Sequence, residues 1–184
     1  ARQLLQQRAA AGQDLTKTAL MVMNTYKHAT STPAALRAMW TLNAIGSTDE
    51  GWLLEQSNDE REHIRTWAIK LLIDKGPLSK KTQKRFIEMA AKDKAGLVQL
   101  HLAGALQQLP LKDRWPLANA LVSHNTFAKD PVLPLMVWYG INPAVPNHNA
   151  EALKLVARCK LPKVRQFIAR RLAGEPSKAN KEKQ

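Results

Sequence analysis

Side chains along this sequence follow a helical spacing that repeats five times. Each block has an anchor residue and further positions three, four and eight residues later, most of them apolar, which is the spacing of one face of an α-helix. The anchors recur every 28 to 35 residues, and such a period is typical of stacked helical repeats. They are Leu36, Ile64, Val98, Leu133 and Val164.

Glycine and proline divide the sequence into an expected leading helix at 1–11 and five helix pairs. The first helices of the pairs are expected near 14–28, 48–57, 79–92, 112–125 and 148–159, and the second helices near 33–45, 61–75, 96–109, 131–141 and 162–173. Gly46, Gly76 and Gly174 follow second helices, where a left-handed C-cap suits glycine.

No segment shows the alternation of a β-strand, so the sequence predicts an all-α fold. The repeat period predicts more narrowly a HEAT-like α-α superhelix, or solenoid, of about five helix pairs over residues 1–173. Residues 174–184 are polar and are expected to form a tail or linker. Because the chain starts at Ala1 and runs directly into helical sequence, we expect it to be a piece of a longer protein.

Composition favours one folded domain with an anionic partner. The chain has 184 residues, of which 45% are hydrophobic, and a formal charge of +13. Nucleic acid, anionic lipid and an acidic protein all remain open as partners. The 20 positions 131–150 carry no formal charge, but their prolines and asparagines favour a buried helix and a proline-rich loop over a membrane span.

Motifs that would indicate chemistry are missing from the sequence. Cys159 is the only cysteine, which excludes an intrachain disulfide, a cysteine zinc cluster and a CxxCH haem attachment. No histidine has another histidine or a cysteine three to five places away, and no phosphate-binding glycine loop is present. His101 is expected to bond to a neighbouring carbonyl. We therefore predict no catalytic, cofactor-binding or metal-binding residue.

Aromatic and basic side chains are the candidate contact groups. The five tryptophans could stack on bases, but Trp40, Trp67 and Trp138 lie in the repeated blocks, where packing is the expected role. Arg37, Arg65 and Arg165 each follow an anchor by one position, and could pair with turn acids such as Asp59 and Asp93 or contact a partner. The block from Arg158 to Arg171 has no acidic residue. The candidate partner-contact residues are Arg37, Arg65, Arg158, Lys160, Lys163, Arg165, Arg170 and Arg171.

Five longer blocks resemble a known family: MWTLNAIG (39–46), HIRTWAIKLL (63–72), LHLAGALQQLPLKDRWPLANAL (100–121), LPLMVWYGINP (133–143) and LPKVRQFIARRLA (161–173). They resemble the HEAT-repeat segment of large bacterial proteins described as membrane-bound dehydrogenases or c-type haem-binding proteins. In that family a sugar-dehydrogenase-like propeller precedes the segment and a cytochrome module usually follows it. The resemblance implies a periplasmic or membrane-associated protein. Because propeller motifs and CxxCH are missing here, no catalytic or haem-ligand residue carries over.

Three functions follow as hypotheses. The first is a non-catalytic helical-repeat scaffold that holds neighbouring dehydrogenase-like and electron-accepting domains of the same chain. The second is a basic nucleic-acid-binding solenoid, similar to HEAT-like DNA glycosylases, which the charge and the tryptophans suggest. The third is a docking platform for an acidic protein.

Overall fold

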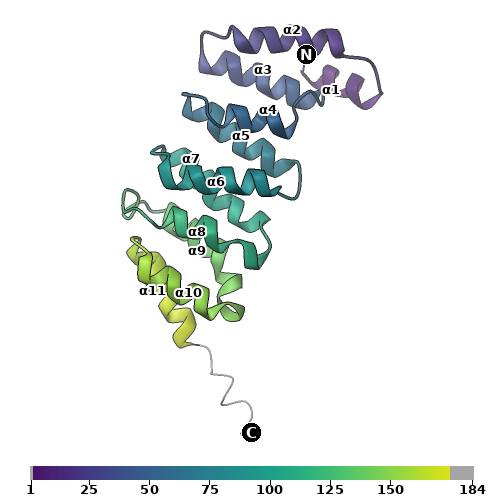
Figure 1. Cartoon of the computed structure of the whole chain (residues 1–184). Helices are drawn as coiled ribbons and strands as arrows, with labels where there is room; N and C mark the ends of the chain where they lie inside the picture. The colour runs from purple at the N-terminus through teal and green to yellow at the C-terminus, as the bar shows by residue number, and fades with distance from the viewer. Residues whose placement is uncertain (1, 175–184) are drawn as a thin grey trace. The chain divides into compact units, whose positions relative to one another are not determined.

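The computed structural model describes residues 2–174, and within that range it contains only helices and their connections (Figure 1). The α-helices are α1 (Arg2–Ala10), α2 (Thr16–Lys27), α3 (Thr32–Ala44), α4 (Glu50–Gln56), α5 (Glu62–Asp74), α6 (Lys80–Lys92), α7 (Gly96–Ala105), α8 (Trp115–Leu121), α9 (Leu133–Ile141), α10 (Asn149–Arg158) and α11 (Pro162–Ala173). Three short 3-10 helices are η1 (Leu106–Gln108), η2 (Leu111–Asp113) and η3 (Asn142–Asn147). The all-α prediction is confirmed, whereas the predicted tail lies almost wholly outside the described residues.

The chain divides into two compact units, Ala1–Lys75 and Gly76–Gln184, called unit 1 and unit 2 below. Unit 1 contains α1 to α5, and unit 2 contains α6 to α11. The boundary falls in the connection between the second and third helix pairs. The single domain expected over 1–173 stays a prediction.

Helix pairs in unit 1 pack as the spacing predicts. α2 packs against α3, α4 packs against α5, and the two second helices α3 and α5 contact each other. The leading helix α1 packs against α3, so it takes the position of a second helix in this unit. Its place in the packing therefore agrees with its sequence, which resembles a second helix.

Unit 2 has two rows of helices. α8 contacts both α6 and α10, which makes a first-helix row, and α9 contacts both α7 and α11, which makes a second-helix row. The core lies between the rows. The anchors Val98, Leu133 and Val164 are all buried there, as are Leu102, Val137 and Ile168 four positions later. Burial of these side chains is what the helical period predicted for the second helices of this unit.

The register of the first block is wrong by one residue. Leu36, the expected anchor, is only half-buried, and the fully buried positions of α3 are Ala35, Met39 and Leu42. Ala35 is small, so the larger Leu36 dominated the sequence pattern. The true anchor is Ala35, and Arg37 therefore follows it by two positions instead of one.

Glycine caps agree with the sequence at two of three positions. Gly46 has φ 73° and Gly76 has φ 110°, a region that a side chain disfavours. The prediction is wrong for Gly174, which has φ −83°. Its N–H donates to the carbonyl of Arg170 at 3.0 Å, so the last turn of α11 ends in right-handed geometry and needs no left-handed residue.

The uncharged segment 131–150 contains more helix than expected. It forms α9 and then the 3-10 helix η3, where a proline-rich loop was predicted. Pro143 and Pro146 fix φ near the helical value, and Ala144 and Val145 between them are fully buried. No helix within residues 2–174 is long and apolar enough to cross a membrane.

Candidate functional site

The outer side of the second-helix row in unit 2 carries an uncharged surface of apolar side chains. Positions one before and two, three and six after each anchor lie together on one side of the helix, turned about 60 to 160° from the anchor, because successive residues are about 100° apart. On α7 and α9 nearly all of these positions are apolar and partly exposed. We call this surface the apolar face; it comprises Leu97, Leu100, His101, Gly104, Val132, Leu135, Met136 and Tyr139.

The apolar face is continuous across two helices. α7 contacts α9, and a Cβ built on Gly104 would lie 3.9 Å from Cε of Met136, so the Met136 side chain reaches over the small residue on α7. Tyr139 is 57% exposed and Val132 is 48% exposed, which is unusual for such side chains. Neither α7 nor α9 contains a charged residue.

His101 provides the polar group of the apolar face. Its Nδ1 lies 2.9 Å from the carbonyl oxygen of Leu97, as expected for an imidazole bonded to a neighbouring carbonyl. A carbonyl can only accept, so Nδ1 donates this hydrogen bond and Nε2 is the ring nitrogen that is left for another contact. A partner that covers this face therefore has one ring nitrogen to satisfy on α7.

Helix α11 borders the apolar face with positive charge. Phe167 of α11 stacks on Trp138 of α9 with ring centroids 5.5 Å apart, which joins the two helices along their outer side. Around this stack α11 exposes Lys163, Arg165, Arg170 and Arg171, and the helix has no acidic residue. The surface therefore changes from uncharged to basic between α9 and α11.

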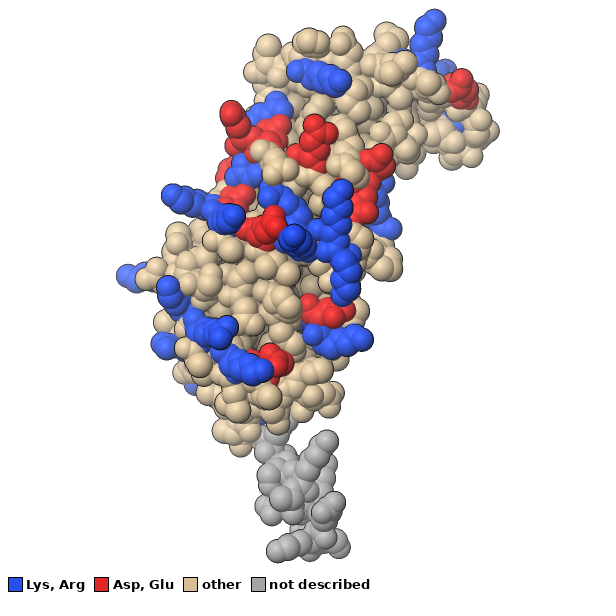
Figure 2. Space-filling model, in the orientation of Figure 1, with Lys and Arg blue, Asp and Glu red and all other residues tan. Residues whose placement is uncertain are grey.

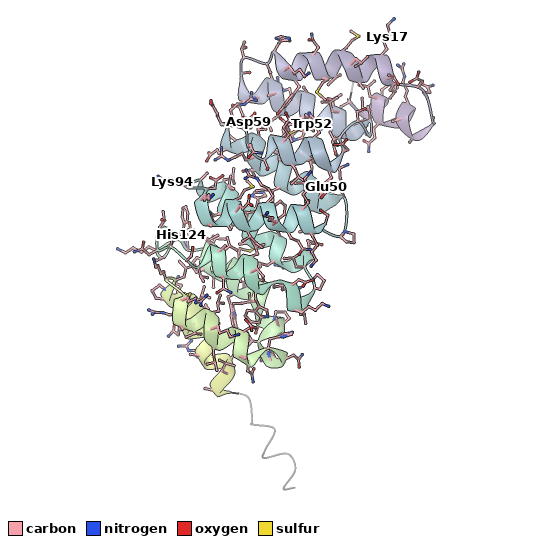
Figure 3. All side chains as sticks on the ribbon, in the orientation of Figure 1. Lys17, Glu50, Trp52, Asp59, Lys94 and His124 are labelled. Atoms are coloured by element: carbon pink, nitrogen blue, oxygen red, sulfur yellow. The ribbon has the colours of Figure 1, made fainter. Side chains whose placement is uncertain are left out.

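A basic edge runs along the turns of unit 2 where the second helices begin. The α8–α9 connection joins these turns, because His124 Nε2 lies 3.2 Å from the carbonyl oxygen of Ala90, and Lys160 N–H donates to the carbonyl of Val122 at 2.8 Å. Figure 3 shows Lys94 and His124 at this edge. Its exposed cations are Lys92, Lys94, Lys129, Arg158, Lys160 and Lys163.

Both carboxylates at the basic edge, Asp130 and Asp93, have structural tasks. Asp130 accepts hydrogen bonds from the N–H groups of Val132 and Leu133 at 2.8 and 2.7 Å, which caps the start of α9. These bonds, with a smaller effect from Lys163, lower the pKa of the Asp130 carboxyl. Asp93 likewise accepts from the N–H of Ala95 at 2.9 Å. Both are the turn roles that their positions favour.

Charge is distributed unequally between the two units. Residues 1–75 hold 9 Lys and Arg against 8 Asp and Glu, whereas residues 76–184 hold 19 against 7. Unit 2 therefore carries +12 of the total +13. Figure 2 shows Lys and Arg gathered over α6 and again over α10 on one face of this unit. The excess of positive charge is thus a property of unit 2.

The structure gives the predicted contact residues different roles. Arg37 is exposed on α3. Arg65 is half-buried, and its Nη1 donates to the carbonyls of Asp59 and Glu60 at 2.9 and 2.8 Å. Gln99, which follows its own anchor by one position as Arg65 does, donates to the carbonyls of Ala90 and Asp93. In these two pairs the residue that follows the anchor therefore bonds the backbone of its turn.

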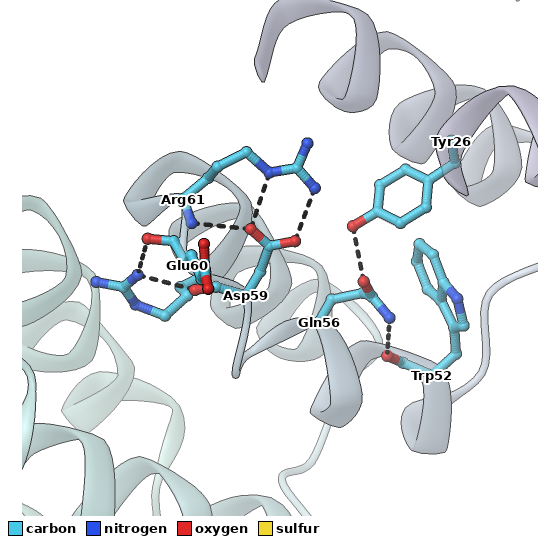
Figure 4. Close-up of polar contacts among 7 residues, drawn as sticks. Tyr26, Trp52, Gln56, Asp59, Glu60 and Arg61 are labelled. Carbon is cyan, nitrogen blue, oxygen red and sulfur yellow. Dashed lines mark hydrogen bonds and ion pairs between the residues drawn. The ribbon is translucent and has the colours of Figure 1, made fainter. Parts of the chain in front are cut away.

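The Asp59 carboxylate has a different partner from the one expected. It accepts from Nε and Nη2 of Arg61 at 2.9 and 2.7 Å, and this bidentate pair lowers the pKa of Asp59 (Figure 4). Arg65 donates to backbone oxygens of this turn, and its positive charge also helps to lower the pKa of the Asp59 carboxyl. The remaining candidates Arg158, Lys160, Lys163, Arg165, Arg170 and Arg171 lie together on α10, α11 and their turn, and all are exposed.

Figure 4 also shows a buried polar contact that links α2 to α4 in unit 1. The Tyr26 hydroxyl donates to Oε1 of Gln56 at 2.7 Å, and the Tyr26 ring packs edge-on against Trp52 at 5.2 Å. Burial, and then the negative charge of Asp59, raises the pKa of Tyr26 to about 12. This contact holds two neighbouring helix pairs together.

This raised pKa predicts a loss of stability in strong alkali. The unfolded phenol ionises near 10.0 while the folded one resists ionisation to about 12, so the free energy of unfolding should fall as pH rises across that window. Tyr26→Phe should reduce this loss, and the tyrosinate absorbance titration should lose its highest transition. If the urea midpoint of the parent chain and that of Tyr26→Phe fall equally as the pH rises, Tyr26 does not cause the loss of stability.

Aromatic side chains in the repeated blocks pack against one another, as predicted. Trp40 and Trp67 meet edge-on at 4.8 Å between α3 and α5. Arg2 lies 5.5 Å from the Trp40 ring centre and Lys70 lies 4.6 Å from that of Trp67, so each ring also has a cation beside it. No tryptophan of this pair offers a free face comparable to Tyr139.

Within residues 2–174 no three side chains of His, Cys, Asp or Glu lie close enough together to hold a metal ion. Cys159 is buried, its thiol donates to the carbonyl of Leu161, and burial raises its pKa. Comparison of the chain with protein-family models, curated proteins and solved structures gives no match.

Sequence reasoning found the basic half of this site and missed the apolar half. Tyr139, Leu135 and Leu100 were not predicted as contact residues. A signal was present, because positions 95–111 and 131–150 contain no charged residue. Packing in a core requires only one apolar side of each helix, and the other side is usually polar. Two neighbouring helices without any charged residue therefore indicate a second apolar side.

Proposed function

We propose that this chain is a non-catalytic, HEAT-like helical scaffold that docks another protein through the apolar face of unit 2. The observation that carries the proposal is the uncharged, partly exposed outer surface of two neighbouring helices, α7 and α9. Protein interfaces have such apolar and aromatic centres with polar rims, and tyrosine, methionine and arginine are enriched in them.

The solenoid form and the place of the chain in a larger protein are parts of the same proposal. The repeat period and the two rows of helices in unit 2 support a superhelix whose second helices are presented to partners. The resemblance in five sequence blocks supports a segment of a dehydrogenase-like, haem-binding protein at the periplasm or membrane. In that setting the docked protein is a neighbouring domain of the same polypeptide or a separate acidic protein.

Nucleic-acid binding is the alternative, and the apolar face weighs against it as the main function. Phosphate contacts require cations spread over the contact surface. The cations in the described part of unit 2 lie on α6, in η2, just before α8, on α10 and α11, and at the basic edge, whereas α7 and α9 supply none. The tryptophans that could stack on bases are packed against other rings.

Photo-crosslinking tests the proposal on the native protein, inside the cells that naturally produce it. A benzophenone amino acid at Tyr139 on the apolar face should form a protein crosslink in high yield. The same probe at Leu153 is a matched control, because Leu153 is similarly exposed at 59% but belongs to α10 in the other row. Equal yields at the two positions, or none at Tyr139, would contradict docking at the apolar face.

A further inference from the structure

We infer that the protein docked on unit 2 presents a surface of two chemistries: apolar side chains over α7 and α9, and carboxylates over α11. This inference rests on the proposed function and specifies the partner by chemistry. It makes the docking face directional, so that a partner fits in one orientation only.

The direction follows from the charges of three consecutive helices in one row. α7 and α9 carry no charge, whereas α11 carries Lys163, Arg165, Arg170 and Arg171 and no acid. α9 packs between the other two helices. Neighbouring helices lie about 8–10 Å apart, so the change from apolar to basic takes place over about 20 Å, well within one standard protein interface.

Two of the cations on α11 face the same way as the apolar face. Lys163 and Arg170 occupy the outer register, one before and six after the anchor Val164, as Val132 and Tyr139 do for Leu133 on α9. Phe167 lies between them and stacks on Trp138, which fixes the border between α9 and α11. A guanidinium and an ammonium at the rim of an aromatic patch suit carboxylates of a partner.

Other classes of macromolecule fit this combination less well. A nucleic acid would place phosphates over α7 and α9, where no cation lies to neutralise them. At a membrane interface a helix buries its whole apolar side in the headgroup and acyl boundary. Here Val132 and Tyr139 are exposed, whereas Leu97, Leu100, Leu135 and Met136 are only partly exposed, with Met136 over Gly104.

The test combines the crosslinker at Tyr139 with matched charge variants. Lys163→Gln with Arg170→Gln removes two charges beside the apolar face, and Lys81→Gln with Lys84→Gln removes two exposed charges from α6 in the other row. The first pair should lower the crosslink yield about tenfold, whereas the second should leave it unchanged. Raising the salt concentration should lower the yield of the parent chain. The captured peptide should contain apolar residues flanked by Asp or Glu.

Each result has a distinct meaning. A crosslink that persists at high salt and in K163Q/R170Q would overturn the acidic partner while docking at the apolar face would stand. If the parent chain, with its charges unchanged, forms no crosslink at Tyr139, the proposed function itself is overturned. A nucleic acid or lipid as the captured species would overturn both. Circular dichroism melts of each variant confirm that a lost crosslink does not come from unfolding.

Discussion

Replacing Phe86 with alanine is expected to lower the free energy of unfolding by about 3 to 5 kcal/mol. Phe86 belongs to α6, is fully buried, and is the largest of the fully buried side chains among the described residues. α6 packs against α8, and Phe86 has Leu109 and Leu117 near it beside a small cavity. Truncation leaves a void that the two helices can close only by moving toward each other.

Urea denaturation followed by circular dichroism measures this effect. Leu153→Ala is the matched control, because it also removes an apolar side chain from a first-row helix, but one that is 59% exposed. It should change the free energy of unfolding by no more than about 0.5 kcal/mol. Similar losses in the two variants would show that the core of unit 2 does not lie between its two rows.

Replacing Gly140 with alanine is expected to destabilise the chain by about 1 to 3 kcal/mol. Gly140 is buried near the end of α9, and a Cβ there would lie 2.6 Å from Cβ and 2.8 Å from Cδ1 of Leu106. A Cβ cannot rotate away, so the backbone of α9 or of η1 must shift. Arg114 resists such a shift because its Nη1 donates to the carbonyl of Gly140.

Gly104 offers the opposite result from the same substitution. It lies within α7, and an added Cβ would meet only Cε of Met136, at 3.9 Å, which is an ordinary contact. Gly104→Ala should therefore raise stability by about 0.5 to 1 kcal/mol through the better helix propensity of alanine. The difference in thermal midpoint between the two variants measures the close approach of α9 to η1, and equal midpoints would refute it.

The sequence predicted most helices to within about three residues because the anchors are large and strictly spaced. Ile64 and Val98 are fully buried, as their blocks required. The predicted anchor was wrong by one residue in α3. Ala35 is fully buried there, but the larger and only half-buried Leu36 was taken as the anchor. Hydrophobic spacing identifies large side chains, so it misplaces a stripe wherever a small residue sits at the closest approach of two helices.

The candidate site was only half predictable for a related reason. Basic residues without acidic neighbours are visible in sequence, so Lys163 and Arg170 were found before the structure. Tyr139 and Met136 read as core in a helix without charges, and only packing shows which apolar positions lie outside. The part of the site that gives specificity therefore required the arrangement of α7, α9 and α11 in one row.

Arg65 shows how a shared register position can mislead. It follows an anchor as Arg165 does, which suggested a row of contact residues. In the structure Arg65 bonds the carbonyls of its own turn, and Gln99 does the same for the next pair. The positions of Arg65 and Gln99 are therefore explained by the hydrogen bonds of their own turns, and Arg65 is not part of the proposed docking surface.

Hydroxyl-radical footprinting tests the docking face most directly. The oxidation rates of Tyr139 and Met136 would be compared between the isolated chain and the native protein inside the cells that naturally produce it. Leu153 serves as the reference. Docking at the apolar face predicts that both rates fall several-fold in the cellular polypeptide while that of Leu153 stays the same. Equal oxidation of Tyr139 and Met136 in the two samples would contradict the account.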